Sequence, residues 1–179
     1  MNHFYVTEKQ EKILHSALHL FAQKGFDGTS TRQVAQRAEV SEGLIFRHFG
    51  SKEGLLEAIL KRGEEMAAEA VKPVLEATAP KEVIAKALEM PFEIKVDSYQ
   101  TWRLIYALKW QTDRYSAVGL EVLRQKLSEA FAALGCEDPV SEAEIVLMYL
   151  DGAATALLLH PPQAQHRLLQ TLKKKYALQ

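Results

Sequence analysis

The chain has 179 residues, of which 47% are hydrophobic and 25% are charged, and its formal net charge is −1 at pH 7. This composition argues against intrinsic disorder, and a chain of this length can bury a core without disulfides or metal. The single cysteine, Cys136, excludes an intramolecular disulfide, and the near-neutral charge gives no evidence of its own for a nucleic-acid partner.

Helical periodicity extends along most of the chain, and no alternating apolar and polar run is long enough to predict a β-strand. The first helix is predicted over 7–24, where Thr7 and Gln10 have the spacing of a capping box and Gly25 supplies the stop. No basic segment followed by a long apolar run precedes this helix, as a signal peptide would require. We therefore expect a cytoplasmic protein.

Two short helices with a tight turn between them come next. Ser30 and Gln33 form a second capping box, which opens a helix that ends at Ala38, and after the turn Ser41 caps a helix over 42–48. Capped helices joined in this way are typical of a helix-turn-helix, in which the second helix enters the major groove of DNA.

The exposed side of 42–48 and the neighbouring helix starts carry candidate DNA contacts. Ile45 and Phe49 should face the core, which turns Leu44 and Arg47 toward DNA. Leu44 can contact only apolar groups such as a thymine methyl, whereas Arg47 suits guanine or a phosphate, or is a solvated charge. His48 is either a DNA contact or a packing residue. The candidate DNA-binding residues are Thr31, Arg32, Ser41, Glu42, Gly43, Leu44, Phe46, Arg47, His48 and Lys52.

A long helix follows over 52–77, capped by Ser51 and weakened or bent by Gly63 and Pro73. Pro91 either breaks or kinks the helical segment that contains it. These signals predict an all-α fold of about nine helices. The remaining helices are predicted at 80–95, 98–110, 116–134, 141–159 and 163–177.

Ser98 and Ser116 are predicted helix caps, and Ser141 with Glu144 forms a third capping box at the start of the most apolar helix. The apolar part of that helix contains Asp151 and is shorter than the roughly 20 residues that a membrane span needs. We expect no membrane partner.

The helix-turn-helix segment matches a known family pattern over about fifty residues. The matching residues are Gly25-Phe26, Thr29-Ser30, Arg32, Val34-Ala35, Ala38, Val40-Ser41, Gly43, Ile45, His48-Phe49, Ser51-Lys52 and Leu55. This run resembles the DNA-binding domain of the TetR family of transcriptional regulators.

The resemblance implies a three-helix DNA-binding domain over 1–51 and a helical regulatory and dimerisation domain over 52–179. It also implies a homodimer that reads a roughly palindromic operator in double-stranded DNA. A small-molecule effector would move the long fourth helix and change the spacing of the two DNA-reading helices, so the expected function is that of a ligand-released repressor.

Four positions depart from the family pattern. Glu39 stands where a turn glycine is usual, which predicts backbone strain, and Phe46 replaces a tyrosine whose hydroxyl often reaches a phosphate. Leu44 stands where a small or hydroxylated residue is usual. Glu42 stands where lysine is frequent, and it either accepts a hydrogen bond from cytosine N4 or lowers non-specific affinity.

Aromatic residues recur at helical spacing in the predicted helix 98–110 and suggest an effector site. They either line an apolar ligand cavity or fill an ordinary core. Asp151 anchors a cationic ligand, pairs with an arginine such as Arg103, or lies at a wet edge. The candidate ligand-binding residues are Met90, Phe92, Tyr99, Trp102, Tyr106, Trp110, Tyr149 and Asp151.

The last two predicted helices combine small residues, which permit close helix approach, with leucine stripes. The resemblance implies a dimer interface there, although the same pair of helices would also serve to close the core of a monomer. The candidate interface residues are Gly152, Ala153, Ala156, Leu157, Leu168, Leu169, Leu172 and Tyr176.

Two other classes of function remain. An enzyme is disfavoured, because the sequence has no nucleophile elbow, phosphate loop or metal-ligand cluster. His15 and His19, one helical turn apart, are the single weak candidate for metal binding. We expect no cofactor. The alternative is a regulator without a small-molecule effector, controlled by a protein partner or by DNA alone, and a filled aromatic stripe would favour it. Repression and activation are not separated by the sequence.

Overall fold

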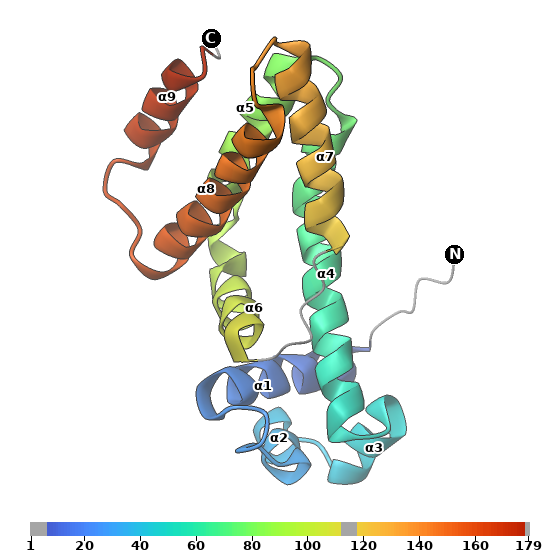
Figure 1. Ribbon diagram of the computed structural model, residues 1–179. Coiled ribbons are helices and arrows are strands. Elements are labelled where there is room, and N and C mark those ends of the chain that lie inside the picture. Colours follow the sequence, from blue (N-terminus) through green and yellow to red (C-terminus); the bar gives the residue numbers. More distant parts are fainter. Residues whose placement is uncertain (1–6, 112–117, 178–179) are drawn as a thin grey trace. The chain divides into compact units, whose positions relative to one another are not determined.

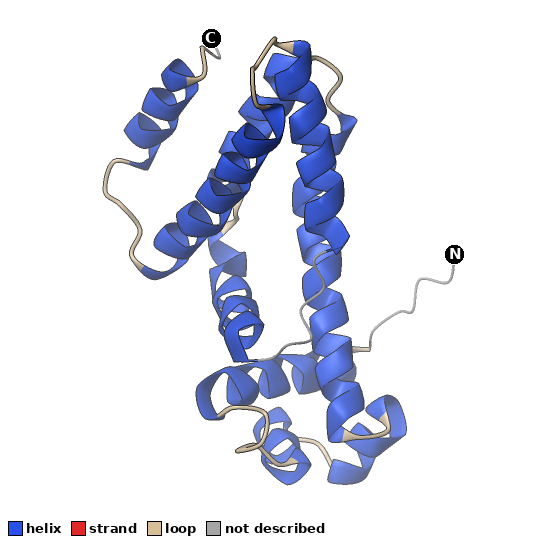
Figure 2. Cartoon of the chain, viewed as in Figure 1, coloured by secondary structure: helices blue, strands red, loops and turns tan. Residues whose placement is uncertain are grey.

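The computed structural model describes residues 7–111 and 118–177, and every regular element within them is helical (Figures 1 and 2). The prediction of an all-α chain with about nine helices is confirmed for these residues. The elements are α1 (Glu8–Lys24), α2 (Thr31–Ala38), α3 (Glu42–Phe49), α4 (Lys52–Glu76), α5 (Pro80–Glu89), the 3₁₀-helices η1 (Met90–Glu93) and η2 (Val96–Ser98), α6 (Tyr99–Gln111), α7 (Val118–Ala133), α8 (Pro139–Leu159) and α9 (Gln165–Lys175).

The helices belong to two compact units. The first, called here the reader unit, comprises Met1–Gly63 and Gln100–Tyr115, and the second unit comprises Glu64–Tyr99 and Ser116–Gln179. These units divide α4 at Gly63, whereas the sequence places the domain boundary between residues 51 and 52. The predicted boundary at 51/52 separates the DNA-binding helices from the regulatory helices, and it stays a prediction.

Capping fixes the helix ends of the reader unit where the sequence predicts them. The Thr7 hydroxyl accepts a hydrogen bond from the Gln10 backbone N–H at 3.3 Å, and the Gln10 side chain accepts one from the Thr7 N–H at 2.8 Å. Ser30 and Gln33 form the same reciprocal pair at 3.2 Å and 3.0 Å. Gly25 ends α1 with a φ of 77°, a conformation that favours glycine.

One apolar core holds the reader unit together. Ile13 and Phe21 of α1, Val34 of α2, Ile45 of α3 and Leu55 of α4 are all fully buried. Burying a side chain of this kind stabilises a fold by about 1.5–3 kcal/mol. Because Ile45 is the one fully buried residue of α3, it anchors that helix, while Gly43, Phe46 and Arg47 remain exposed.

α4 continues through both Gly63 and Pro73 without ending. A Cβ atom at Gly63 would lie 3.3 Å from Cγ2 of Ile105 on α6, so glycine permits the close approach of these two helices. Gly63 therefore serves packing as well as lowering the local helix propensity, which is the effect that the sequence predicts.

α5, α7 and α8 pack against one another in the second unit. Their buried side chains include Leu88, Leu123, Phe131 and Val146, and α9 packs on α5 at the edge of this core. Pro91 breaks rather than kinks the predicted helix 80–95, because α5 ends at Glu89 and the 3₁₀-helix η1 follows. The predicted cap Ser116 lies outside the described residues.

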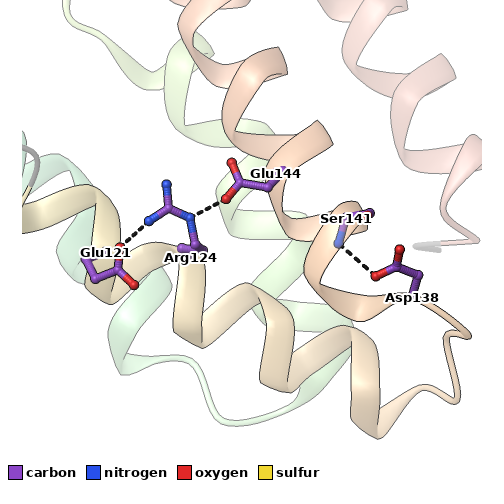
Figure 3. Close-up of polar contacts among 5 residues, drawn as sticks. All are labelled: Glu121, Arg124, Asp138, Ser141 and Glu144. Atoms are coloured by element: carbon purple, nitrogen blue, oxygen red, sulfur yellow. Dashed lines mark hydrogen bonds and ion pairs between the residues drawn. The ribbon is translucent and has the colours of Figure 1, made fainter.

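The start of α8 corrects the third predicted capping box (Figure 3). Asp138 is the N-cap, its carboxylate accepts from the Ser141 N–H at 3.1 Å, and Pro139 occupies the first turn, where its fixed φ suits a helix. Hydrogen bonding from Ser141 holds the pKa of Asp138 below its ordinary value. Glu144 instead pairs with Arg124 of α7, which also pairs with Glu121.

Candidate DNA-binding interface

α3 presents an open surface on the side away from its buried anchor Ile45. Gly43, Phe46 and Arg47 are exposed, and the 48% exposure of Phe46 leaves part of its ring accessible to a partner. Leu44 is half-buried. The predicted division of α3 into an inward and an outward side therefore holds for Ile45, Gly43 and Arg47.

His48 and Phe49 lie at the border between the two sides of α3. Both are half-buried, and their ring centroids are 6.2 Å apart in an edge-on arrangement. This contact supports a packing role for His48, and its predicted contact with DNA stays a prediction. Phe49 is less buried than expected for a residue that faces the core.

The turn between α2 and α3 contains the strain that the sequence predicts. Glu39 adopts φ 55° and ψ 43°, the left-handed conformation that glycine would occupy at lower cost. The next residue, Val40, donates its backbone N–H to the Ala35 carbonyl at 3.0 Å, which closes the end of α2. The turn thus keeps its geometry although its residue type is unfavourable.

A side-chain hydrogen bond joins the starts of α2 and α3. The Thr31 hydroxyl donates to Oε1 of Glu42 at 2.5 Å, and the two residues are half-buried. A carboxylate in the first turn of α3 also interacts favourably with the helix dipole. Thr31, predicted as a phosphate contact, thus uses its hydroxyl within the protein. Ser41 occupies the N-cap position of α3 as predicted, but its side chain accepts no capping hydrogen bond.

Lys52 makes contacts that the sequence did not predict. Its Nζ donates to the Phe26 carbonyl at 3.0 Å and to the Thr29 carbonyl at 3.2 Å, and it lies 4.2 Å from the centroid of the Phe26 ring. These partners are 23 and 26 residues away in the chain, and capping or periodicity carries no signal of them. The ammonium that was predicted to meet a phosphate therefore holds the α1–α2 loop.

An open groove of about 580 Å³ lies beside these contacts in the reader unit. It is bordered by the α1–α2 loop, the start of α2, Phe46 of α3 and the start of α4. Asp27 and Glu53 contribute acidic side chains and Lys52 a basic one. The full lining is Asp27, Gly28, Thr29, Ser30, Thr31, Gln33, Phe46, Ser51, Lys52 and Glu53.

The candidate effector residues are distributed over both units. Trp102 and Tyr106 are half-buried on α6 of the reader unit, whereas Tyr99 belongs to the second unit; the Trp110 side chain lies outside the described residues. A cavity formed by residues of the two units stays a prediction.

Four further candidates lie in the second unit, and two of them contact its core. Tyr149 and Met90 pack against the core, and Tyr149 donates its hydroxyl hydrogen to the Leu88 carbonyl at 3.4 Å. Burial raises the pKa of Tyr149 to about 12. Phe92 and Asp151 are half-buried.

The candidate dimer residues separate into inward and outward groups. Leu157 is 2% exposed, so the predicted interface role is wrong for this side chain: it faces the interior of its own chain. Leu172 and Tyr176 pack partly against the core of the second unit. Gly152 and Ala156 of α8 and Leu168 of α9 are exposed, while Ala153 and Leu169 are half-buried.

The candidate interface residues do not include the largest exposed apolar residues of α8. Ile145, Met148 and Leu159 are 51%, 74% and 53% exposed. With Gly152 and Ala156 they recur at intervals of three and four residues, which places them on one face of the helix. Apolar residues lie on both the exposed and the buried sides of α8, so its periodicity did not distinguish the two faces.

The described residues hold neither a metal-ion cluster nor a membrane-spanning helix. No group of three or more His, Cys, Asp or Glu side chains there is arranged to hold a metal ion. Partial burial, Arg37 and His15 together hold the pKa of His19 below its ordinary value. Within the same ranges, no helix combines the length and the apolar character needed to cross a membrane.

Comparison with known proteins agrees with this geometry. The family model described as "Bacterial regulatory proteins, tetR family" matches residues 13–59, from α1 into α4. The HTH-type transcriptional repressor Rv3405c of Mycobacterium tuberculosis is 39% identical over 77 residues, which are 43% of this chain and 39% of that protein. The chain spans only 32% to 39% of the length of this and three other curated relatives.

Solved structures extend the similarity to the whole chain. Salmonella enterica GusR matches with a TM-score of 0.68 at 22% identity, over 97% of both chains. AibR, solved with isovaleryl coenzyme A and operator DNA, matches with a TM-score of 0.61 at 20% identity, over 87% of this chain and 100% of that one. At such identities the similarity concerns the fold. With its anchored and open α3 and the family match over residues 13–59, the segment from α1 into α4 is a DNA-binding domain of the TetR type, and the chain has the fold of TetR-family regulators.

Proposed function

We propose that the chain is a sequence-specific DNA-binding transcriptional regulator, and that it acts as a homodimeric repressor. The observation that carries this proposal is the surface of α3: Ile45 fixes the helix in the core, while Gly43, Phe46 and Arg47 remain open to a partner. A short helix that is rigidly anchored and exposed along one side suits insertion into the major groove. The similarity to the repressor Rv3405c supports the choice of repression for this proposal.

Individual contacts follow from the chemistry of the exposed side chains. Arg47 would form a bidentate contact with guanine or pair with a phosphate, and Leu44 and Phe46 would contact thymine methyl groups. Arg32, exposed in the first turn of α2, would pair with a phosphate near the backbone N–H groups of that helix start. Glu42, held by Thr31, would lower the affinity for phosphates in general or accept from a cytosine amino group.

Dimerisation is proposed to use the exposed face of α8. Ile145, Met148 and Leu159 supply apolar area, and Gly152 and Ala156 let a second helix come close. A two-fold dimer through this face would present two α3 helices to a roughly palindromic operator. Leu168 on α9 would add to the interface.

A small apolar or aromatic effector is proposed to release the operator. AibR was solved with isovaleryl coenzyme A and operator DNA, and the apolar isovaleryl group of that ligand supports an effector with an apolar part. Within the second unit, the proposed contacts are Met90 and Tyr149, which pack against its core. Loss of operator binding on addition of acyl coenzyme A thioesters would identify the effector class.

The experiment that tests the proposed function is selection of the purified chain against a random DNA library at about 150 mM salt, followed by sequencing. An enriched palindrome is the expected result, with half-sites about one helical turn apart or a multiple of it. A folded dimer that enriches no sequence, with or without acyl coenzyme A thioesters, would contradict the proposal.

A further inference from the structure

The α1–α2 loop leads directly into the start of α2, and it is tightly bonded. Thr29 is 2% exposed, and its hydroxyl lies 2.9 Å from the Gly25 carbonyl and 3.3 Å from the Leu20 carbonyl. The Phe26 ring meets Phe21 edge to face, with centroids 5.3 Å apart. These contacts tie the loop to α1 and position Thr29, the residue before the α2 N-cap.

Lys52 is the contact that joins this loop to the first turn of α4. Its Nζ donates to the carbonyls of Phe26 and Thr29, at opposite ends of the loop, and lies over the Phe26 ring. Two of its three N–H donors are thus used inside the protein. Charge-assisted hydrogen bonds of this kind are stronger than neutral ones, and the ring face adds a favourable cation–π contact.

We propose that Lys52 is a positioning residue for DNA binding rather than a phosphate contact. By holding the carbonyls of Phe26 and Thr29, it sets the place of the α2 start, and with it Thr31 and Arg32, relative to α4. A displacement of the first turn of α4 would therefore be passed to α2 through Lys52. This inference rests on the proposed function, because it assigns a role within the same DNA-binding surface.

The charges around Lys52 also support a positioning role rather than a phosphate contact. Asp27 and Glu53 line the groove that Lys52 also lines, so two carboxylates share that groove with one ammonium. A DNA phosphate placed there would meet two like charges for one opposite charge. Arg32 and Arg47 are exposed, and neither of them lines this groove.

Two substitutions in the full chain separate positioning from phosphate pairing. Lys52→Met keeps the apolar stem and removes the ammonium, whereas Lys52→Arg keeps the charge but replaces the compact ammonium by a planar guanidinium. Lys61→Met is the matched control, because Lys61 is an exposed lysine further along α4. Operator affinity is measured across a range of salt concentrations, together with hydrogen exchange of the backbone amides of residues 29–33.

Positioning predicts that both Lys52 variants bind the operator roughly tenfold more weakly than the Lys61→Met control, with faster amide exchange at 29–33. The slope of log affinity against log salt stays equal to that of the control. Phosphate pairing predicts a slope smaller by about 0.9 for Lys52→Met, near-normal affinity for Lys52→Arg and unchanged exchange, and this result would overturn the inference. Unchanged affinity and exchange in both variants would overturn it as well.

Failure of the proposed function would be recognised separately. In that case the unsubstituted chain would select no operator, whereas failure of the present inference leaves operator binding by the unsubstituted chain intact. If Lys52→Met does not fold, Lys52→Arg decides by itself, since the two explanations predict opposite results for it.

Discussion

The left-handed residue Glu39, between α2 and α3, allows a stability effect to be predicted from one backbone angle. A non-glycine residue in this conformation costs roughly 1–2 kcal/mol, and glycine avoids that cost but loses about 0.5–1 kcal/mol more conformational entropy on folding. Glu39→Gly should therefore stabilise the reader unit by about 0.5–1 kcal/mol. Its φ of 55° is the structural basis of this expectation.

The assay can use the natural fluorophores of the chain. Both tryptophans, Trp102 and Trp110, belong to the reader unit, so their fluorescence in urea reports on the unfolding of that unit. Glu39→Ala is the matched control, since it removes the same carboxylate but keeps a Cβ in the strained conformation. If the glycine and alanine variants unfold at the same urea concentration, backbone strain at the turn does not limit stability.

Further predictions concern recognition, assembly and pH. If Arg47 reads a base, Arg47→Ala should weaken specific operator binding by about 1–3 kcal/mol. If the variant keeps the same preference among operator sequences, Arg47 contacts only the DNA phosphate backbone. Met148→Glu should shift the dimer toward monomer in light scattering, whereas the same change at the exposed Val96 should not. The pKa of His19 in the folded chain lies below its ordinary value, so the unfolded chain binds more protons at low pH. The free energy of unfolding of the reader unit should therefore fall as pH drops below about 6.5. His19→Gln should weaken this pH dependence in urea titrations. Glu42→Gln should raise affinity for all sequences if the carboxylate repels phosphates, or relax preference at one base pair if it reads cytosine, and selection with the variant distinguishes the two.

Features set by neighbours in the chain were predictable. The capping boxes at Thr7 and Ser30 and the strained turn at Glu39 depend on residues no more than a few positions apart, and the structure shows them as expected. At α8 two local signals competed: the Asp138-Pro139 pair starts the helix before Ser141 can cap it, because proline is already set in a helical φ.

Contacts between distant residues were not predictable. The roles of Lys52 and Glu42 depend on carbonyls and a hydroxyl that the fold brings from elsewhere in the chain, and residue type alone suggested DNA contacts for both. The outward face of α8, which includes Met148, was not recognised for a different reason: apolar residues lie on both the exposed and the buried sides of this helix, so its hydrophobic periodicity is weak.

The most direct test of the central claim is DNA cleavage from α3 itself. In a Cys136→Ser background, which removes the one native cysteine, Arg47→Cys can carry an iron chelate that cuts DNA close to its attachment point. Gln170→Cys on the exposed surface of α9 is the control. The proposed function predicts two cleavage patterns from position 47, one in each half-site and symmetric about the operator centre, with none from position 170. Cleavage from position 170, or an absence of cleavage from position 47 on a bound operator, would contradict the assignment of α3 as the DNA-reading helix.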